Sequence, residues 1–170
     1  MTQLSLGIRN LLSQDTALRS LLGRSVSWDT WIFSDDPVGV KVEGTQKCLI
    51  VVTENGTWSP PNSYNTQRFP RVFVDIWADP TRNSNGSVKI SDAKDKIEVI
   101  VKRVNSHLHT VDQARPNGMP LIWGTAEQIA DKTGVVVNGS QQLDGPDYSP
   151  IRDSAGSFMG RLTYGVNAIS

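Results

Sequence analysis

The fold is decided by a seven-residue stretch of alternating side chains, RVFVDIW, at positions 71–77. Successive side chains of a β-strand point to opposite faces of the sheet. One face therefore carries the aliphatic residues Val72, Val74 and Ile76. The other face carries Phe73, Asp75 and Trp77. This alternation of β-forming residues predicts a strand at the centre of a sheet.

A long amphipathic helix is predicted downstream of this strand. Apolar residues recur at helical spacing over 90–108, while most charged residues of the segment fall on the other faces. Ser87 or Ser91 is placed to cap the amino end of this helix, where Asp92 complements the helix dipole.

A shorter amphipathic segment opens the chain. Its apolar stripe consists of Leu4, Ile8, Leu11, Leu18 and Leu22. Gly23 is placed to end the helix. Residues 13–15 interrupt the stripe, and Asp15 is a suitable cap for a second helix over 16–22. The sequence leaves open whether this segment is one helix or two.

Further β-prone segments complete the predicted sheet. The candidate strands are 28–33, 39–42, 48–53, 120–123, 134–137, 140–143 and 158–168. The first three are expected to form a meander. Asn138-Gly139 is the strongest hairpin signal in the chain. Gly160 and Gly165 suggest bulges or close backbone approach in the last strand.

This order of helices and strands predicts an α+β fold in one domain, residues 1–170. We expect a largely antiparallel β-sheet with the N-terminal helix and the long helix packed on one face. Residues 54–70 contain turn formers without periodicity, which predicts a long loop. Its aromatic residues and arginine are of the types enriched at protein interfaces. The candidate interface residues of this loop are Trp58, Pro60, Pro61, Tyr64 and Arg68.

Composition excludes several classes of protein. The 17 Lys and Arg residues balance 17 Asp and Glu residues, which does not favour binding to nucleic-acid phosphates. The longest apolar run, 48–52, is far below the roughly 20 residues of a membrane span. The first 23 residues are unlike a secretory signal, so we expect a cytosolic protein that has no membrane as a partner. Cys48 lies in this apolar run and is expected in the core.

The sequence offers no catalytic, metal or cofactor site. His107 and His109 point about 200° apart on a helix, and no nearby Cys or carboxylate completes a metal site. Asp75 is unusual within a strand, but an exposed sheet face or a pairing with Arg71 accounts for it. No nucleophile elbow or glycine-rich phosphate loop occurs. We therefore expect a protein that is not an enzyme and needs no cofactor.

Asn-Gly occurs three times, at positions 55–56, 85–86 and 138–139, each time followed by Ser or Thr. This matches the glycosylation acceptor pattern, but a chain without a secretory signal does not meet that machinery. Turn formation by Asn-Gly is the simpler interpretation.

The order of elements carries a resemblance: an opening helix with Asp15-Thr16-Ala17-Leu18, the strand 71–77, the helix 92–108 and closing strands. It resembles the tail terminator family of long-tailed bacteriophages. The segment 143–148, LDGPDY, followed by Pro150, Asp153, Gly156 and MGRLTYGV at 159–166, is similar to members from phages of actinobacteria in particular. Residues 54–67 are long for the compact members.

This resemblance implies a structural virion protein without catalysis or a cofactor. Its subunits would form a sixfold ring, a homo-hexamer, that caps the tail tube and ends its polymerisation. The implied partners are further copies of the chain, the tail tube protein and the head-tail connector, with DNA only passing through the lumen. The implied location is the head-tail junction of the virion, after assembly in the host cytoplasm.

Other functions remain open at this point. A head-tail stopper or a minor tail protein would share the neutral charge and oligomeric surfaces, although two well-formed helices argue against a mostly β stopper. A small carboxylate-dependent hydrolase requires two acids that converge in a pocket. A glycan-binding module requires clustered exposed aromatic residues.

Overall fold

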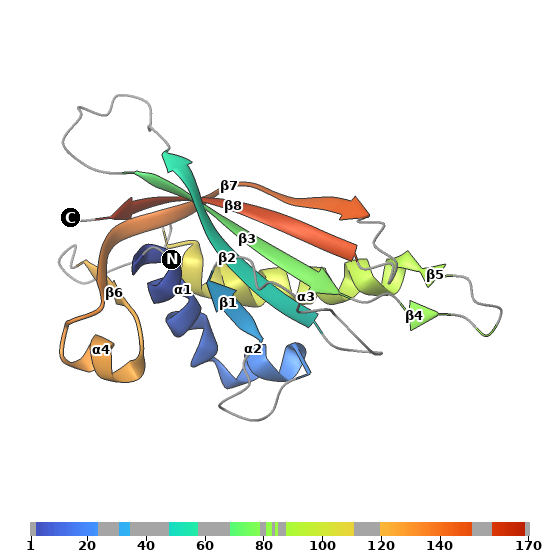
Figure 1. Cartoon of the computed structure of the whole chain (residues 1–170), viewed down its shortest axis with the longest axis horizontal. Helices are drawn as coiled ribbons and strands as arrows, with labels where there is room; N and C mark the ends of the chain where they lie inside the picture. Colours follow the sequence, from blue (N-terminus) through green and yellow to red (C-terminus); the bar gives the residue numbers. More distant parts are fainter. Residues whose placement is uncertain are drawn as a thin grey trace.

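The computed structural model describes residues 3–23, 31–34, 48–57, 69–78, 81–82, 84, 88–110, 120–150 and 158–168 (Figure 1). Its helices are α1 (Gln3–Ser13), α2 (Thr16–Leu21), α3 (Ile90–Leu108) and α4 (Ala126–Ala130). Its strands are β1 (Ile32–Ser34), β2 (Cys48–Thr57), β3 (Pro70–Ala78), β4 (Thr81–Arg82), β5 (Val88–Lys89), β6 (Leu121–Trp123), β7 (Val135–Pro150) and β8 (Phe158–Ala168). The predicted strand at 39–42 lies outside the described residues.

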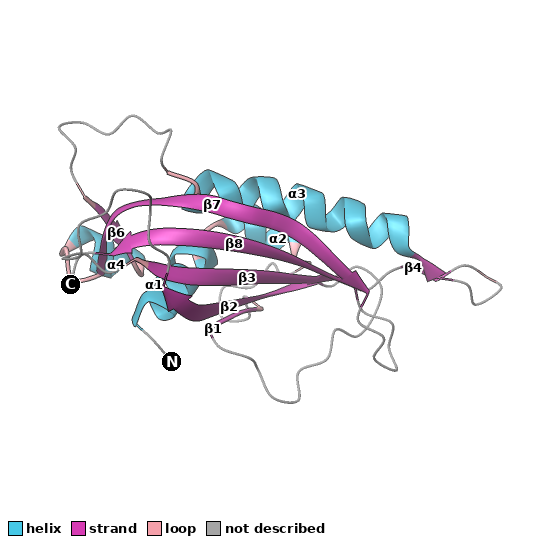
Figure 2. Ribbon diagram, turned by 90° about the horizontal axis from the view of Figure 1, so that it is seen from above, coloured by secondary structure: helices cyan, strands magenta, loops and turns pink. Residues whose placement is uncertain are grey.

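Six strands form one sheet in the order β1-β2-β3-β8-β7-β6 (Figure 2). The predicted central strand is confirmed, because β3 pairs antiparallel with β2 on one side and β8 on the other. Helices α1, α2 and α3 lie on the same side of this sheet (Figure 1). The predicted α+β class, with a largely antiparallel sheet and helices on one face, is thereby confirmed.

The predicted meander is wrong where the structure describes it. A meander through 28–33, 39–42 and 48–53 would place its middle strand between the other two, but β1 pairs directly with β2 and runs parallel to it, with Phe33 opposite Val51. Parallel neighbours need a connection of about a dozen residues or more, because the chain must return to the starting end of the strand. The segment 35–47 between them is long enough for such a connection.

The core lies between the helices and the sheet. The predicted inward residues of β3, Val72, Val74 and Ile76, are all 0% exposed. Ile97 and Val104 of α3 belong to the same buried cluster, as does Cys48, which confirms that the single cysteine is a core residue. A Cβ atom at Gly160 of β8 would lie only 2.8 Å from Cγ2 of Ile97. Gly160 therefore serves the close approach of α3 to the sheet.

The opening segment forms two helices. Asp15 adopts an extended conformation between α1 and α2, and its side chain accepts a hydrogen bond from the backbone N–H of Leu18. Gly23 follows α2 with φ of +76°, the left-handed conformation that favours glycine after a helix. Both predicted end signals are confirmed, and the interruption at 13–15 is a break.

The predicted hairpin at Asn138-Gly139 is wrong. β7 runs unbroken through it, and the register against β8 shifts between Val137 and Gly139. The extra residue forms a bulge, because Val137 and Ser140 on either side are buried and hold the strand in the sheet. The register of β7 against β8 shifts at two further places, whereas β8 pairs with β3 without a shift. The bulges suggested for the last strand lie in β7 instead.

Two further expectations need correction. β2 continues to Thr57 through a register shift after Glu54 and β3 begins at Pro70, so the two ends of the predicted loop at 54–70 belong to strands, while residues 58–68 lie outside the described residues. Ser91 lies inside α3 rather than at its cap, while Asp92 falls in the first turn as expected.

Candidate functional site

The five predicted interface residues, Trp58, Pro60, Pro61, Tyr64 and Arg68, lie outside the described residues. The structure places the strands that flank them. Thr57, at the end of β2, pairs with Pro70, at the start of β3. The two strand ends that flank these residues therefore lie side by side at one end of the sheet.

The sheet face opposite the helices, called the open face below, carries a second apolar cluster. Leu49 and Val51 of β2 are buried there, packed against the partly buried Trp31, Phe33 and Trp77. The rings of Trp31 and Phe33 meet edge to face at 6.4 Å. Trp31 has φ of +52°, which is rare for a bulky residue and costs conformational energy.

An ion pair lies beside this cluster on the open face. Asp75 of β3 stands directly opposite Arg161 of β8. Arg161 donates to both carboxylate oxygens, with Nε–Oδ1 at 2.7 Å and Nη2–Oδ2 at 2.8 Å. Its guanidinium also stacks over Phe73 at 4.3 Å. Asp75 is thus explained by cross-strand pairing, but its partner is Arg161 and not the predicted Arg71.

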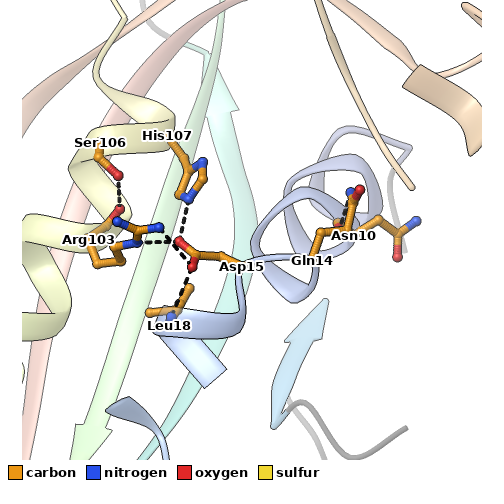
Figure 3. Close-up of polar contacts among 7 residues, drawn as sticks. All are labelled: Asn10, Gln14, Asp15, Leu18, Arg103, Ser106 and His107. Carbon is orange, nitrogen blue, oxygen red and sulfur yellow. Dashed lines mark hydrogen bonds and ion pairs between the residues drawn. The ribbon is translucent and has the colours of Figure 1, made fainter. Parts of the chain in front are cut away.

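A second charged cluster joins the helices (Figure 3). Asp15, whose side chain is only 3% exposed, accepts from Arg103 Nε at 2.5 Å and Nη2 at 3.0 Å. The Nε2 atom of His107 lies 2.6 Å from the same carboxylate. Because Asp15 also caps α2, this carboxylate ties the α1–α2 corner to the last turns of α3.

The electrostatics of this cluster are those of a structural contact. Burial alone would raise the pKa of Asp15, but hydrogen bonds from Arg103 and His107 outweigh it and hold that pKa well below its usual value. A carboxylate that stays ionised and fully bonded is a poor proton acceptor for catalysis. The cluster faces a shallow depression that is also lined by Leu11 and Gln14.

The two neighbouring histidines have separate partners, as their spacing predicts. His107 contacts Asp15, whereas Nδ1 of His109 accepts from the backbone N–H of Gln142 at 3.0 Å. Over the described residues, no three His, Cys, Asp or Glu side chains are grouped to hold a metal ion.

The sequence did not predict α4, which stands beside β6 at one end of the molecule (Figure 1). None of its residues is buried, and Ile129 is 37% exposed. A reciprocal capping box between Thr125 and Gln128 stabilises it. The pattern Thr-x-x-Gln is a recognised start signal for a helix and was the available clue. A cavity of about 170 Å³ lies between α1 and this end of the sheet, lined by Leu6 and Trp123 among others.

Comparison with known proteins gives a likeness in fold. No family model matches the sequence, and no curated protein matches it. One solved structure, described as "Virion of native gene transfer agent (GTA) particle", contains a chain of similar fold, with a TM-score of 0.52 and 13% sequence identity. The match covers 97% of this chain and 93% of that chain.

None of the described helices is long and apolar enough to cross a membrane.

Proposed function

We propose that this protein is a structural component of a phage-like virion, and specifically a tail terminator. Copies of the chain form a ring, which we propose to be hexameric, that caps the tail tube, ends its polymerisation and joins the tail to the head-side connector. Its location is the head-tail junction. The protein has no catalytic role, and DNA passes through the ring without being bound.

The observation that carries this proposal is the fold match to a chain of a virion particle over nearly the whole length of both chains. The resemblance of 143–148 and 159–166 to tail terminators adds to it, because these segments lie in β7 and β8, two adjacent strands of the sheet. The zero net charge suits a ring through which DNA must slide.

The described sheet edges favour ring contacts through side chains rather than through strand pairing. β1 has only three residues, and Nε of Arg9 donates to the backbone carbonyl of Ile32 at 3.1 Å. On the other side, the outer strand β6 also has only three residues, and the part of β7 beyond its pairs with β6 contains Pro146 and register shifts against β8. Short, capped or bulged edges discourage pairing with another chain. We therefore assign the ring contact to the 58–68 segment, with Trp58 and Tyr64 as its anchors.

The experiment is to measure the mass of the purified protein in solution and to image it by negative stain, alone and mixed with polymerised tail tube protein. Rings, or caps on the ends of tubes that stop growing, are expected. A monomer that ignores tubes would refute the terminator role.

The head-tail stopper is the second candidate, because the same fold match suits any connector of such a particle. A stopper would bind the head-side connector and leave tube ends uncapped. Because both candidates would bind the connector, the mixture with tube protein separates them: caps on tube ends indicate a terminator, and connector binding without caps indicates a stopper.

A further inference from the structure

Two of the three Asn-Gly pairs lie in the described residues, and both occupy strand bulges. Asn55-Gly56 lies in β2, where the register against β3 shifts between Glu54 and Thr57. Asn138-Gly139 lies in β7, where the register shifts after Val137. The two pairs share one chemistry but differ in how firmly the structure holds them.

The shared chemistry is intramolecular. The backbone nitrogen of the glycine attacks the side-chain carbonyl carbon of the asparagine, a C–N bond forms, and the side-chain amide leaves as ammonia with the proton from that nitrogen. Water then opens the succinimide at either carbonyl, which leaves aspartate or isoaspartate. Glycine permits this because it has no Cβ to hinder the ring and adopts the conformations that the ring requires. No enzyme or cofactor takes part.

Asn55-Gly56 is placed to react. Both residues are exposed, and Gly56 has φ of +70°; apart from the glycine itself and its two chain neighbours, no described residue comes within 4 Å of the position that a Cβ would take. Beyond the bulge, the described pairing of β2 continues only with Thr57 opposite Pro70. Rotating the backbone of Asn55 therefore disturbs only the end of the sheet.

Asn138-Gly139 is held on both sides. Val137 is 0% exposed and pairs with strands on either side, Leu121 of β6 and Ala168 of β8. The backbone of Ser140 forms two hydrogen bonds with Thr110: its N–H donates to the side-chain Oγ1 of Thr110 and its carbonyl accepts from the N–H of Thr110, both at 2.9 Å. Cyclisation here requires opening of the buried sheet.

We propose that Asn55 is a site of spontaneous deamidation in the folded protein and that Asn138 is protected. The product places a new negative charge next to Glu54, and isoaspartate adds a methylene group to the main chain at the bulge. The change falls at the base of the 58–68 segment. This inference does not depend on the proposed function.

The test is to hold the native protein at mildly alkaline pH, withdraw samples over weeks, and quantify both peptides by mass spectrometry with fragmentation that distinguishes isoaspartate. The Asn55 peptide is expected to convert at least about tenfold faster than the Asn138 peptide, a ratio that reflects local opening. In denaturant the two rates should converge. Asn55→Ser should abolish the fast conversion and leave Asn138 unchanged. Equal native rates, or faster conversion at Asn138, would overturn the proposal.

Discussion

At the scale of single residues, the carboxylate of Asp15 connects two helices, α2 and α3. It caps α2 through the N–H of Leu18 and receives both Arg103 and His107 from α3. Arg103 is 45% exposed, so water screens part of its attraction to the carboxylate. Asp15 itself is buried, so removing its carboxylate leaves donors without an acceptor, which increases the loss of stability.

We expect Asp15→Ala to lower the free energy of unfolding by about 2–4 kcal/mol, because it removes both the cap and the ion pairs. Asp15→Asn is the matched control, since asparagine caps helices well but carries no charge. Its loss should be smaller, about 1–2 kcal/mol. Urea denaturation of the three proteins measures both values. No loss in Asp15→Asn would show that the charged contacts with Arg103 and His107 contribute nothing, and equal losses in the two variants would show that the cap contributes nothing beyond those contacts.

Acid should remove the charged part of this stabilisation. Burial alone would raise the pKa of Asp15, but hydrogen bonds from Arg103 and His107 lower it below the ordinary value of 3.8. A carboxyl with a lowered folded-state pKa stabilises fully above its unfolded pKa and loses that contribution as the pH falls toward the folded value. The stability difference between wild type and Asp15→Asn should therefore shrink below pH 3.8. Denaturation curves at several acidic pH values test this, and a constant difference would contradict it.

The sequence predicts the local half of this cluster. Asp15 follows an interruption of the apolar stripe, and helix capping depends only on neighbours along the chain. Arg103 and His107 lie 88 and 92 positions further on. Their approach to Asp15 is set by how α2 packs on α3, which periodicity does not encode. The same limit explains why Arg161 was missed as the partner of Asp75.

At the scale of elements, local signals were misleading where packing overrides them. Asn138-Gly139 has the composition of a hairpin, but buried neighbours in the sheet turn it into a bulge. The helix α4 shows the reverse case, because its short apolar content gave no periodic signal while its capping box was present in the sequence. Caps rather than packing hold this helix in place.

We expect Thr125→Ala to open α4 without unfolding the protein. The cap contributes about 1 kcal/mol, and no residue of α4 is buried. Hydrogen exchange should therefore accelerate at the amides of α4, while the midpoint of global unfolding stays the same. Thr125→Ser retains the capping hydroxyl and serves as the control. A shift of the global midpoint would mean that α4 is part of the cooperative core.

A side chain at Gly160 should weaken the contact between β8 and α3. A Cβ atom there would lie 2.8 Å from Cγ2 of Ile97 and needs a shift of the helix. We expect Gly160→Ala to cost about 1–3 kcal/mol, as overpacking does. In the background of Ile97→Ala, where that methyl group is absent, the same substitution should cost less. A double-mutant cycle by denaturation measures the coupling, and strictly additive losses would rule out the steric explanation.

At the scale of the whole molecule, the α+β class followed from two patterns that are long enough to be unambiguous, the alternation at 71–77 and the helical stripe at 90–108. The parallel pairing of β1 with β2 did not follow from the sequence, because it depends on the path of a long connection rather than on either strand. Neither pattern predicts ring formation, because a ring requires two complementary surfaces on one subunit. Ring formation therefore has to be tested with substitutions of surface residues that leave the fold intact.

The final prediction concerns the proposed ring. We expect Trp58→Ala combined with Tyr64→Ala to abolish rings while the temperature of unfolding stays close to that of wild type. An aromatic anchor at the centre of an interface contributes about 2 kcal/mol or more, which weakens association roughly thirtyfold per residue. Ile129→Ala removes exposed apolar surface from α4 instead and should leave rings intact. Analytical ultracentrifugation compares all three proteins. Rings that survive in the double variant would show that the subunits do not contact one another through the 58–68 segment. Rings that form but no longer cap tubes would show that this segment contacts the tube instead.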